Sequence, residues 1–150
     1  MTAVLAGSRV EATRFIDRWL SMWNGDLQLA WEIIAPELTI HLPQVGMPPE
    51  STVHDPQSMA GWIGLFRSSY SSATFTCELG PFVDGEHLIS RFRFTGVWIG
   101  GRPAIATAPP GTEVNFAGVD ILRLERGRVA EYWLTDDQLD LYGQLGAVRD

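Results

Sequence analysis

One acidic residue in this sequence stands where a charge is costly. Asp120 lies between two branched aliphatic residues in a segment with few polar side chains, and a carboxylate in such surroundings needs either a partner or a function. In a strand, alternation places Asp120 on the same face as Phe116, Gly118 and Leu122. Burial raises the pKa of a carboxyl toward the range that suits proton transfer. Asp120 is therefore predicted to act as a general acid or base, or to pair with an arginine. The candidate partners are Arg91, Arg93 and Arg123.

Two adjacent carboxylates, Asp136 and Asp137, follow shortly after Trp133. An aspartate directly before a helix accepts hydrogen bonds from free backbone amides and lies near the positive end of the helix dipole. This position favours a capping role for the pair over catalysis. The proton chemistry is then expected upstream of them.

His41 lies in the alternating segment ELTIHLP, which predicts a short strand. A neutral imidazole there can relay a proton or orient Asp120, or it can be structural. His54 and His87 are expected at exposed positions. The three histidines lack the spacing of metal ligands, and no glycine-rich phosphate loop or dinucleotide motif is present. We therefore expect neither a metal nor a cofactor.

The composition limits the classes of partner. The 150 residues fit a single domain over 1–150, and the net charge of −7 disfavours nucleic acid and anionic membranes. No apolar run approaches the roughly 20 residues of a membrane helix. The only cysteine, Cys77, excludes an intrachain disulfide, and we expect a cytoplasmic location. The six Trp, seven Phe and three Tyr suit a large core or a flat apolar pocket.

Hydrophobic periodicity predicts a helix-rich first part followed by antiparallel strands. The first predicted helix ends at Asn24-Gly25, a second covers 26–35, a third starts at Asp55-Pro56 and the last covers 137–144. The later strands are predicted at about 73–82, 86–98, 114–125 and 128–135. A loop rich in Gly, Ala and Pro, 99–113, has the length of a lid or binding loop. Such a sheet can curl around the helices and leave a cavity.

The C-terminal third resembles a known family. The segments VNFAGVDILRLERGRVAEYW and DQLDLYGQLG are similar to the SnoaL-like polyketide cyclases of the nuclear-transport-factor-2-like superfamily. The preceding PPGTEV resembles a Pro-Pro-Thr-Gly turn of that family. The matching positions are Asp120, Ile121, Arg123, Gly127, Trp133, Asp137, Gln144, Leu145 and Gly146.

This resemblance implies an α+β fold in which a curved antiparallel sheet and helices form a cone-shaped cavity. Its well-known members close a carbon ring by aldol condensation without a cofactor, using a pocket Asp supported by a His. The matching positions here hold Leu134 and Asp120, so the usual acid is missing. The resemblance makes the Asp120 face the cavity and implies catalytic roles for Asp120 and His41. The expected substrate-binding residues are Trp23, Trp62, Phe66, Trp98, Tyr132 and Leu134. It also implies a homodimer through the open sheet face, with Trp133 and Ile121 outward.

Three hypotheses follow for the function. The first is a cofactor-independent acid/base enzyme that acts on a hydrophobic polyketide-type small molecule by ring closure or isomerisation. The second is an epoxide-opening enzyme, which needs paired carboxylates and an arginine. The third is a small-molecule-binding protein that has lost its catalytic acid, as Leu134 suggests.

Overall fold

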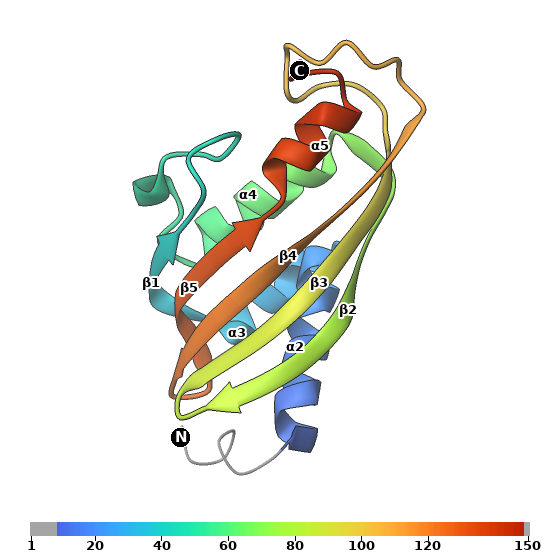
Figure 1. Cartoon of the computed structure of the whole chain (residues 1–150). Helices are drawn as coiled ribbons and strands as arrows, with labels where there is room; N and C mark the ends of the chain where they lie inside the picture. The colour runs from blue at the N-terminus through green and yellow to red at the C-terminus, as the bar shows by residue number, and fades with distance from the viewer. Residues whose placement is uncertain (1–8, 149–150) are drawn as a thin grey trace.

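The computed structural model describes residues 9–148, which form an α+β fold with one open, curved sheet. The strands are β1 (Ile34–His41), β2 (Tyr70–Asp84), β3 (His87–Trp98), β4 (Thr112–Glu125) and β5 (Arg128–Asp136), in the spatial order β1-β5-β4-β3-β2. The strands β2 to β5 are antiparallel, as predicted. The edge strand β1 pairs with β5 in parallel, which the expectation of an all-antiparallel sheet missed. Figure 1 shows the long strands twisting across one side of the helices.

The two hairpin turns lie where the sequence predicts them. Gly85 has a φ of 59°, and Arg126 and Gly127 have φ values of 54° and 77°. Positive φ in these positions matches the twist of hairpin strands, and glycine adopts it without a steric penalty. These turns fix the register in which Asp120 pairs with Ser90 on one side and Leu134 on the other.

The main helices cover one face of the sheet. They are α2 (Arg9–Trp23) and α4 (Pro56–Arg67), while α5 (Gln138–Gln144) follows β5 at one end. The start of α4 is as predicted, because the side chain of Asp55 accepts a hydrogen bond of 2.8 Å from the amide of Ser58, with Pro56 in the first turn.

The predicted helix over 26–35 is shorter than expected. A 3-10 turn, η1 (Leu27–Leu29), leads into a single helical turn, α3 (Ala30–Ile33), and β1 begins at Ile34. Ile34 is fully buried and pairs with Val129 of β5. Pro36 is tolerated in β1 because an edge strand can lack an amide donor.

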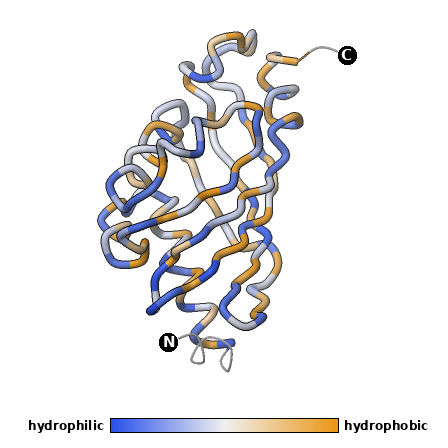
Figure 2. Tube along the Cα trace, turned by 90° about the vertical axis from the view of Figure 1, so that its left-hand side faces the viewer, coloured by the Kyte–Doolittle hydropathy of each residue, from blue (hydrophilic) through white to orange (hydrophobic). Residues whose placement is uncertain are grey.

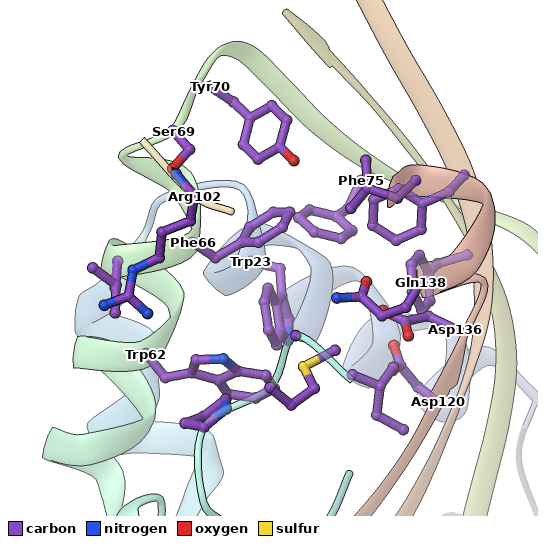
Figure 3. Close-up of a pocket in the computed structure, with 18 of the residues that line it drawn as sticks. Trp23, Trp62, Phe66, Ser69, Tyr70, Phe75, Arg102, Asp120, Asp136 and Gln138 are labelled. Atoms are coloured by element: carbon purple, nitrogen blue, oxygen red, sulfur yellow. The ribbon is translucent and has the colours of Figure 1, made fainter. Parts of the chain in front are cut away.

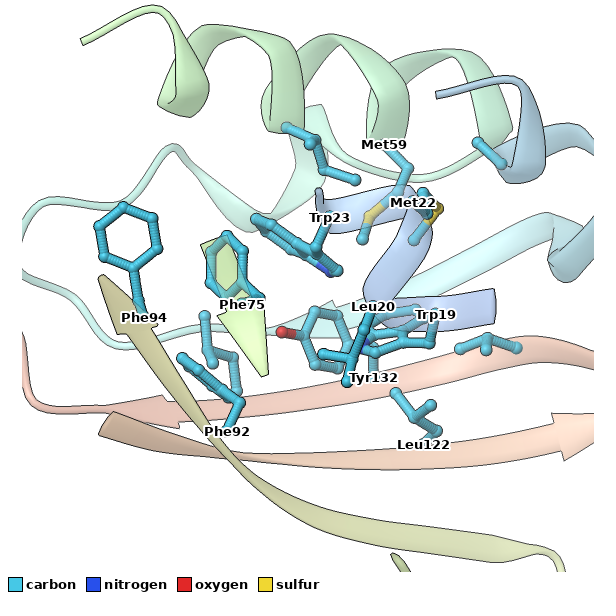
Figure 4. Close-up of a cluster of buried hydrophobic side chains, with 14 of the residues drawn as sticks. Trp19, Leu20, Met22, Trp23, Met59, Phe75, Phe92, Phe94, Leu122 and Tyr132 are labelled. Atoms are coloured by element: carbon cyan, nitrogen blue, oxygen red, sulfur yellow. The ribbon is translucent and has the colours of Figure 1, made fainter. Parts of the chain in front are cut away.

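The core lies between these helices and the inner face of the sheet. Buried positions alternate mainly with half-buried ones along β3, β4 and β5, and Figure 2 shows hydrophobic and hydrophilic residues interleaved along the chain. Figure 4 shows the aromatic and aliphatic side chains that meet between the layers, among them Trp19, Met22, Met59 and Phe94, all fully buried. Among the described helices, none is long and apolar enough to cross a membrane.

Candidate active site

A cavity of about 110 Å³ opens between α2, α4 and the inner face of the sheet. Five of the six predicted wall residues line it, namely Trp23, Trp62, Phe66, Tyr132 and Leu134. The indole rings of Trp23 and Trp62 meet edge to face with centroids 5.0 Å apart. Most of the wall is therefore apolar and aromatic, which suits a flat hydrophobic ligand.

The sixth predicted wall residue, Trp98, does not line this cavity. Its side chain is buried, and its indole N–H donates a hydrogen bond of 2.9 Å to the carbonyl oxygen of Arg102. The ring anchors the loop that follows β3, so the prediction of a substrate contact does not hold for Trp98. The same loop brings Arg102 and Pro103 to the cavity.

Trp23 is held in place by contacts of its neighbours. The side-chain amide of Asn24 bonds both backbone groups of Phe75, at 3.0 and 2.7 Å. The guanidinium of Arg67 donates to the carbonyl oxygen of Trp23 at 3.0 Å. These bonds tie the end of α2 to β2 and α4, and so fix one aromatic wall of the cavity.

Asp120 lies on the inner face of β4, and its carboxyl lines the cavity. It is only 3% exposed. One carboxyl oxygen accepts a hydrogen bond of 2.6 Å from the hydroxyl of Tyr132, and the other accepts one of 3.0 Å from the indole N–H of Trp19. Both oxygens are thus held by neutral donors.

These surroundings shift the acidity of the site. Burial raises the pKa of Asp120 to about 6, against the opposing effect of its two hydrogen bonds. Burial and the negative charge of Asp120 raise the pKa of Tyr132 well above its ordinary value. The carboxyl of Asp120 therefore titrates near neutrality, while the hydroxyl of Tyr132 stays protonated and donates to it.

Asp136 also lines the cavity, which the capping prediction did not anticipate. Its side chain is partly buried, and its Oδ1 atom is buried without a hydrogen-bond partner among the described residues. Burial and then the charge of Asp120 raise the pKa of Asp136 to about 7. Within residues 9–148, no cationic side chain forms an ion pair with either aspartate.

The neighbouring carboxylate has the predicted capping role. Asp137 is the residue before α5, and its side chain accepts a hydrogen bond of 3.0 Å from the amide of Asp140. The two adjacent acids therefore occupy different positions in the structure. Asp137 starts the helix, whereas Asp136 ends β5 on the cavity face.

Gly118 makes room for the side chain of Asp136. The two residues are direct partners across β4 and β5. A Cβ atom on Gly118 would lie 2.7 Å from the Cβ of Asp136 and 2.6 Å from the ring of Phe92. A side chain at this position would therefore displace Asp136 or Phe92, and only glycine fits without a shift.

His41 lies outside the cavity, so its predicted role beside Asp120 does not hold. Its Nε2 atom is 2.7 Å from a carboxylate oxygen of Glu131, and its ring stacks on Trp133 with centroids 5.1 Å apart. Alternation along β1 turns Ile40 inward and His41 outward. The imidazole therefore belongs to the outer face of the sheet.

The predicted arginine partners of Asp120 also lie on the outer face. Arg91 and Arg93 both bind the carboxylate of Glu78, with an N–O distance of 2.7 Å for Arg91. Arg123 binds Glu131 at 3.1 Å. Asp120 consequently has no arginine partner among the described residues, and the interpretation as a structural ion pair does not hold.

The mouth of the cavity is formed by two loops and α5. Met47 and Pro48 come from the loop after β1, Arg102 from the loop after β3, and Gln138 and Tyr142 from α5. Figure 3 shows Asp120, Asp136 and Gln138 on one side, facing the indole rings on the other. No group of three or more potential metal-ligating His, Cys, Asp or Glu side chains occurs within residues 9–148.

A family model for the SnoaL-like domain matches residues 12–132. The chain belongs to the SnoaL-like domain family. A comparison with curated protein sequences gives no match.

Solved structures share the fold of this SnoaL-like chain. TsrD from Streptomyces laurentii is 23% identical, with a TM-score of 0.76 and coverage of 94% of this chain and 98% of that one. A candidate polyketide cyclase from Acidithiobacillus ferrooxidans is 19% identical, with a TM-score of 0.75 and coverage of 89% and 93%. IdmH from Streptomyces antibioticus, also a candidate polyketide cyclase, is 23% identical, with a TM-score of 0.74 and coverage of 90% and 98%. At these identities the likeness establishes the fold and not the reaction.

Two side chains of this SnoaL-like site, those of Trp19 and Asp136, were not predicted as site residues from the sequence. Trp19 lies on the buried face of α2, and the hydrogen bond from its indole N–H to Asp120 joins residues far apart in the chain. Asp136 follows Tyr132 and Leu134 on the same strand face. Continuing that alternation by one step would have placed it in the cavity.

Proposed function

We propose that this protein is a cofactor-independent acid/base enzyme that acts on a hydrophobic polyketide-type small molecule, by ring closure or isomerisation. One observation carries the proposal. Two carboxyls, Asp120 and Asp136, share an apolar cavity without an ion-pair partner among the described residues, and both have a pKa raised to near neutrality. A carboxyl of this kind can both remove and return a proton at physiological pH.

The aromatic walls would position the substrate. A flat substrate between the indoles of α2 and α4 and the sheet would be held close to the carboxyl pair, and positioning of this kind lowers the barrier to an intramolecular reaction. The candidate polyketide cyclases among the similar structures support this class of substrate. Leu134 stands at the position of the usual family acid, so the carboxyls available for the proton transfer are those of Asp120 and Asp136.

Deuterium uptake in heavy water tests this function. A panel of bicyclic aromatic ketones, with 1-tetralone as reference, is incubated with the wild type and with the double variant Asp120→Asn/Asp136→Asn, and uptake beside the carbonyl is followed by mass spectrometry. We expect uptake that needs the carboxyl pair. Ligands that bind without any uptake would mean a binding protein instead.

Epoxide opening is a second candidate, and Asp136 favours it. That chemistry needs paired carboxylates, and Asp136 supplies the second one beside Asp120. The arginine of such a set would be Arg102 at the mouth, since Arg91 and Arg93 are engaged by Glu78. Incubation with aryl epoxides in ¹⁸O-labelled water distinguishes the two functions. Labelled diol products would favour epoxide hydrolysis over ketone chemistry.

We also propose that the protein is a homodimer through the outer face of the sheet. Ile121 and Trp133 lie half-buried on that face, beside the stacked ring of His41. Pairing of such faces would cover their apolar side chains. Light scattering that gives the mass of one chain at micromolar concentration would contradict the dimer.

A further inference from the structure

We infer that Asp136 is the side chain that exchanges a proton with the substrate, and that the side-chain amide of Gln138 holds the carbonyl oxygen of the same substrate. The inference rests on the proposed acid/base function and divides the roles within it. Asp120 then acts on Asp136 through its neighbouring negative charge. The substrate class that fits is a flat, apolar ketone with a C–H bond beside the carbonyl.

Asp120 is poorly suited to touch the substrate. Its two oxygens already accept hydrogen bonds from Tyr132 and Trp19, and its side chain is almost fully covered. Both hydrogen bonds lower the pKa of Asp120, so its carboxylate is a weaker base than that of Asp136. Asp136 is more exposed and carries an oxygen without a partner among the described residues. An unpaired buried oxygen of this kind calls for a ligand or a function.

Asp136 lies two residues after Leu134, which stands at the position of the usual family acid. Leu134 pairs directly with Asp120, and Asp136 pairs with Gly118, the next cavity-facing position of β4. Gly118 has no side chain, and the Cβ atom of Asp136 lies beside that space. The acid has thus moved along the same strand face to the end of β5, where α5 and the cavity mouth begin.

Gln138 completes this polar end of the cavity. It lines the cavity two residues after Asp136, and Figure 3 shows its amide directed into the cavity on the same side as Asp136. A Cβ on Gly46 would lie 2.5 Å from its Nε2 atom, so the loop after β1 confines the amide. Within residues 9–148 the amide has no hydrogen-bond partner, which leaves its N–H groups available to a substrate oxygen.

The proton transfer balances with these two groups alone. The carboxylate of Asp136 takes the proton of the C–H bond beside the carbonyl, and the electron pair of that bond moves into the carbonyl group. The product is an enolate whose oxygen accepts a hydrogen bond from Gln138. In heavy water the carboxyl exchanges its proton with solvent, and a deuteron returns to the carbon.

The charged and titratable groups around Asp136 set the pH at which it works. Asp120 of β4 raises the pKa of Asp136, and Asp137 adds a smaller effect of the same sign. Tyr132 of β5 and Tyr142 of α5 also interact with Asp136, and both stay neutral because their own pKa values are raised. Removing the charge of Asp120 therefore lowers the pKa of Asp136.

Single variants in the deuterium-uptake assay separate these roles. With 1-tetralone, Asp136→Asn is expected to lower uptake by at least ~100-fold at every pH, as for loss of a general base. Gln138→Leu is expected to lower kcat by roughly tenfold or more, since a donor to the developing charge is lost. Asp120→Asn is expected to keep uptake at high pH and to move the rising limb of the pH profile down by roughly one unit. Asp140→Asn, on the exposed side of α5, is the matched control and should leave uptake unchanged.

Circular dichroism of each variant checks that it is folded. Retained uptake in folded Asp136→Asn, with loss of uptake at every pH in Asp120→Asn, would overturn the inference while leaving the acid/base function intact. An unchanged kcat in Gln138→Leu would overturn the role of the amide. No uptake in the wild type would remove the proposed function itself and this inference with it.

Discussion

Replacing Asp136 by Asn should make the protein more stable at neutral and higher pH. The carboxyl lacks an ion-pair partner within residues 9–148, and burial and Asp120 raise its pKa from 3.8 to about 7. The difference is about 3 pKa units, which corresponds to about 4 kcal/mol at 1.36 kcal/mol per unit. Asparagine keeps the shape and removes the charge, but it also leaves polar atoms to be satisfied. We therefore expect a net gain on the order of 2 to 4 kcal/mol at pH 8.

The sign follows from linkage. The raised pKa of Asp136 means that the folded state holds its proton more tightly than the unfolded state. The wild type therefore loses stability as the pH rises from the unfolded value near 4 to the folded value near 7. Below pH 4 both states are protonated, and the wild type and Asp136→Asn should differ little. Above pH 7 the full penalty is present in the wild type alone.

Urea denaturation followed by tryptophan fluorescence at pH 4, 6 and 8 measures this effect. Thermal denaturation of the same two proteins at pH 8 should show a Tm that is higher by roughly 10 °C for Asp136→Asn, given a chain of this length. Asp140→Asn removes an exposed carboxylate from the same part of the chain and should change stability by less than about 0.5 kcal/mol. Equal stabilities of the wild type and Asp136→Asn at pH 8 would refute the reasoning about the unpaired carboxyl.

Three further variants test the roles of residues inside and outside the cavity. His41→Ala should leave deuterium uptake within about twofold of the wild type and cost at most about 1 kcal/mol of stability, because the imidazole pairs with Glu131 outside the cavity. Asp137→Ala should cost about 1 kcal/mol in urea denaturation through loss of the helix cap, and an unchanged stability would contradict that role. Gly118→Ala should cost about 1 to 3 kcal/mol and also lower uptake, since its Cβ would displace Asp136; full activity would show that the space beside Gly118 is not needed.

Local patterns were enough to predict most of the sheet. A few neighbouring residues encode the hairpin turns at Gly85 and Gly127 and the alternation of β4. The inward orientation of Asp120 could therefore be predicted. Alternation also places His41 opposite the buried Ile40. The expectation that His41 lies in the cavity came from the family resemblance, and the local pattern contradicted it.

Other features depend on contacts between distant parts of the chain. The parallel pairing of Ile34 with Val129 ended the predicted second helix early, because burial in the sheet outweighed local helix propensity. The position of Trp98 depends on the path of the loop that follows it, which no short motif specifies. Asp136 lies directly before a predicted helix and also continues the alternation of β5. The first pattern favoured a capping role, and the prediction followed it.

The pH dependence of deuterium uptake by the wild type tests the central claim most directly. If the buried carboxyl pair of Asp120 and Asp136 does the chemistry, uptake into 1-tetralone should rise as the pH passes through about 6 to 7, where the base form appears. The double variant should show no such rise. Absence of uptake between pH 5 and 9, for every ketone that binds in the cavity, would contradict the assignment of acid/base chemistry to this site.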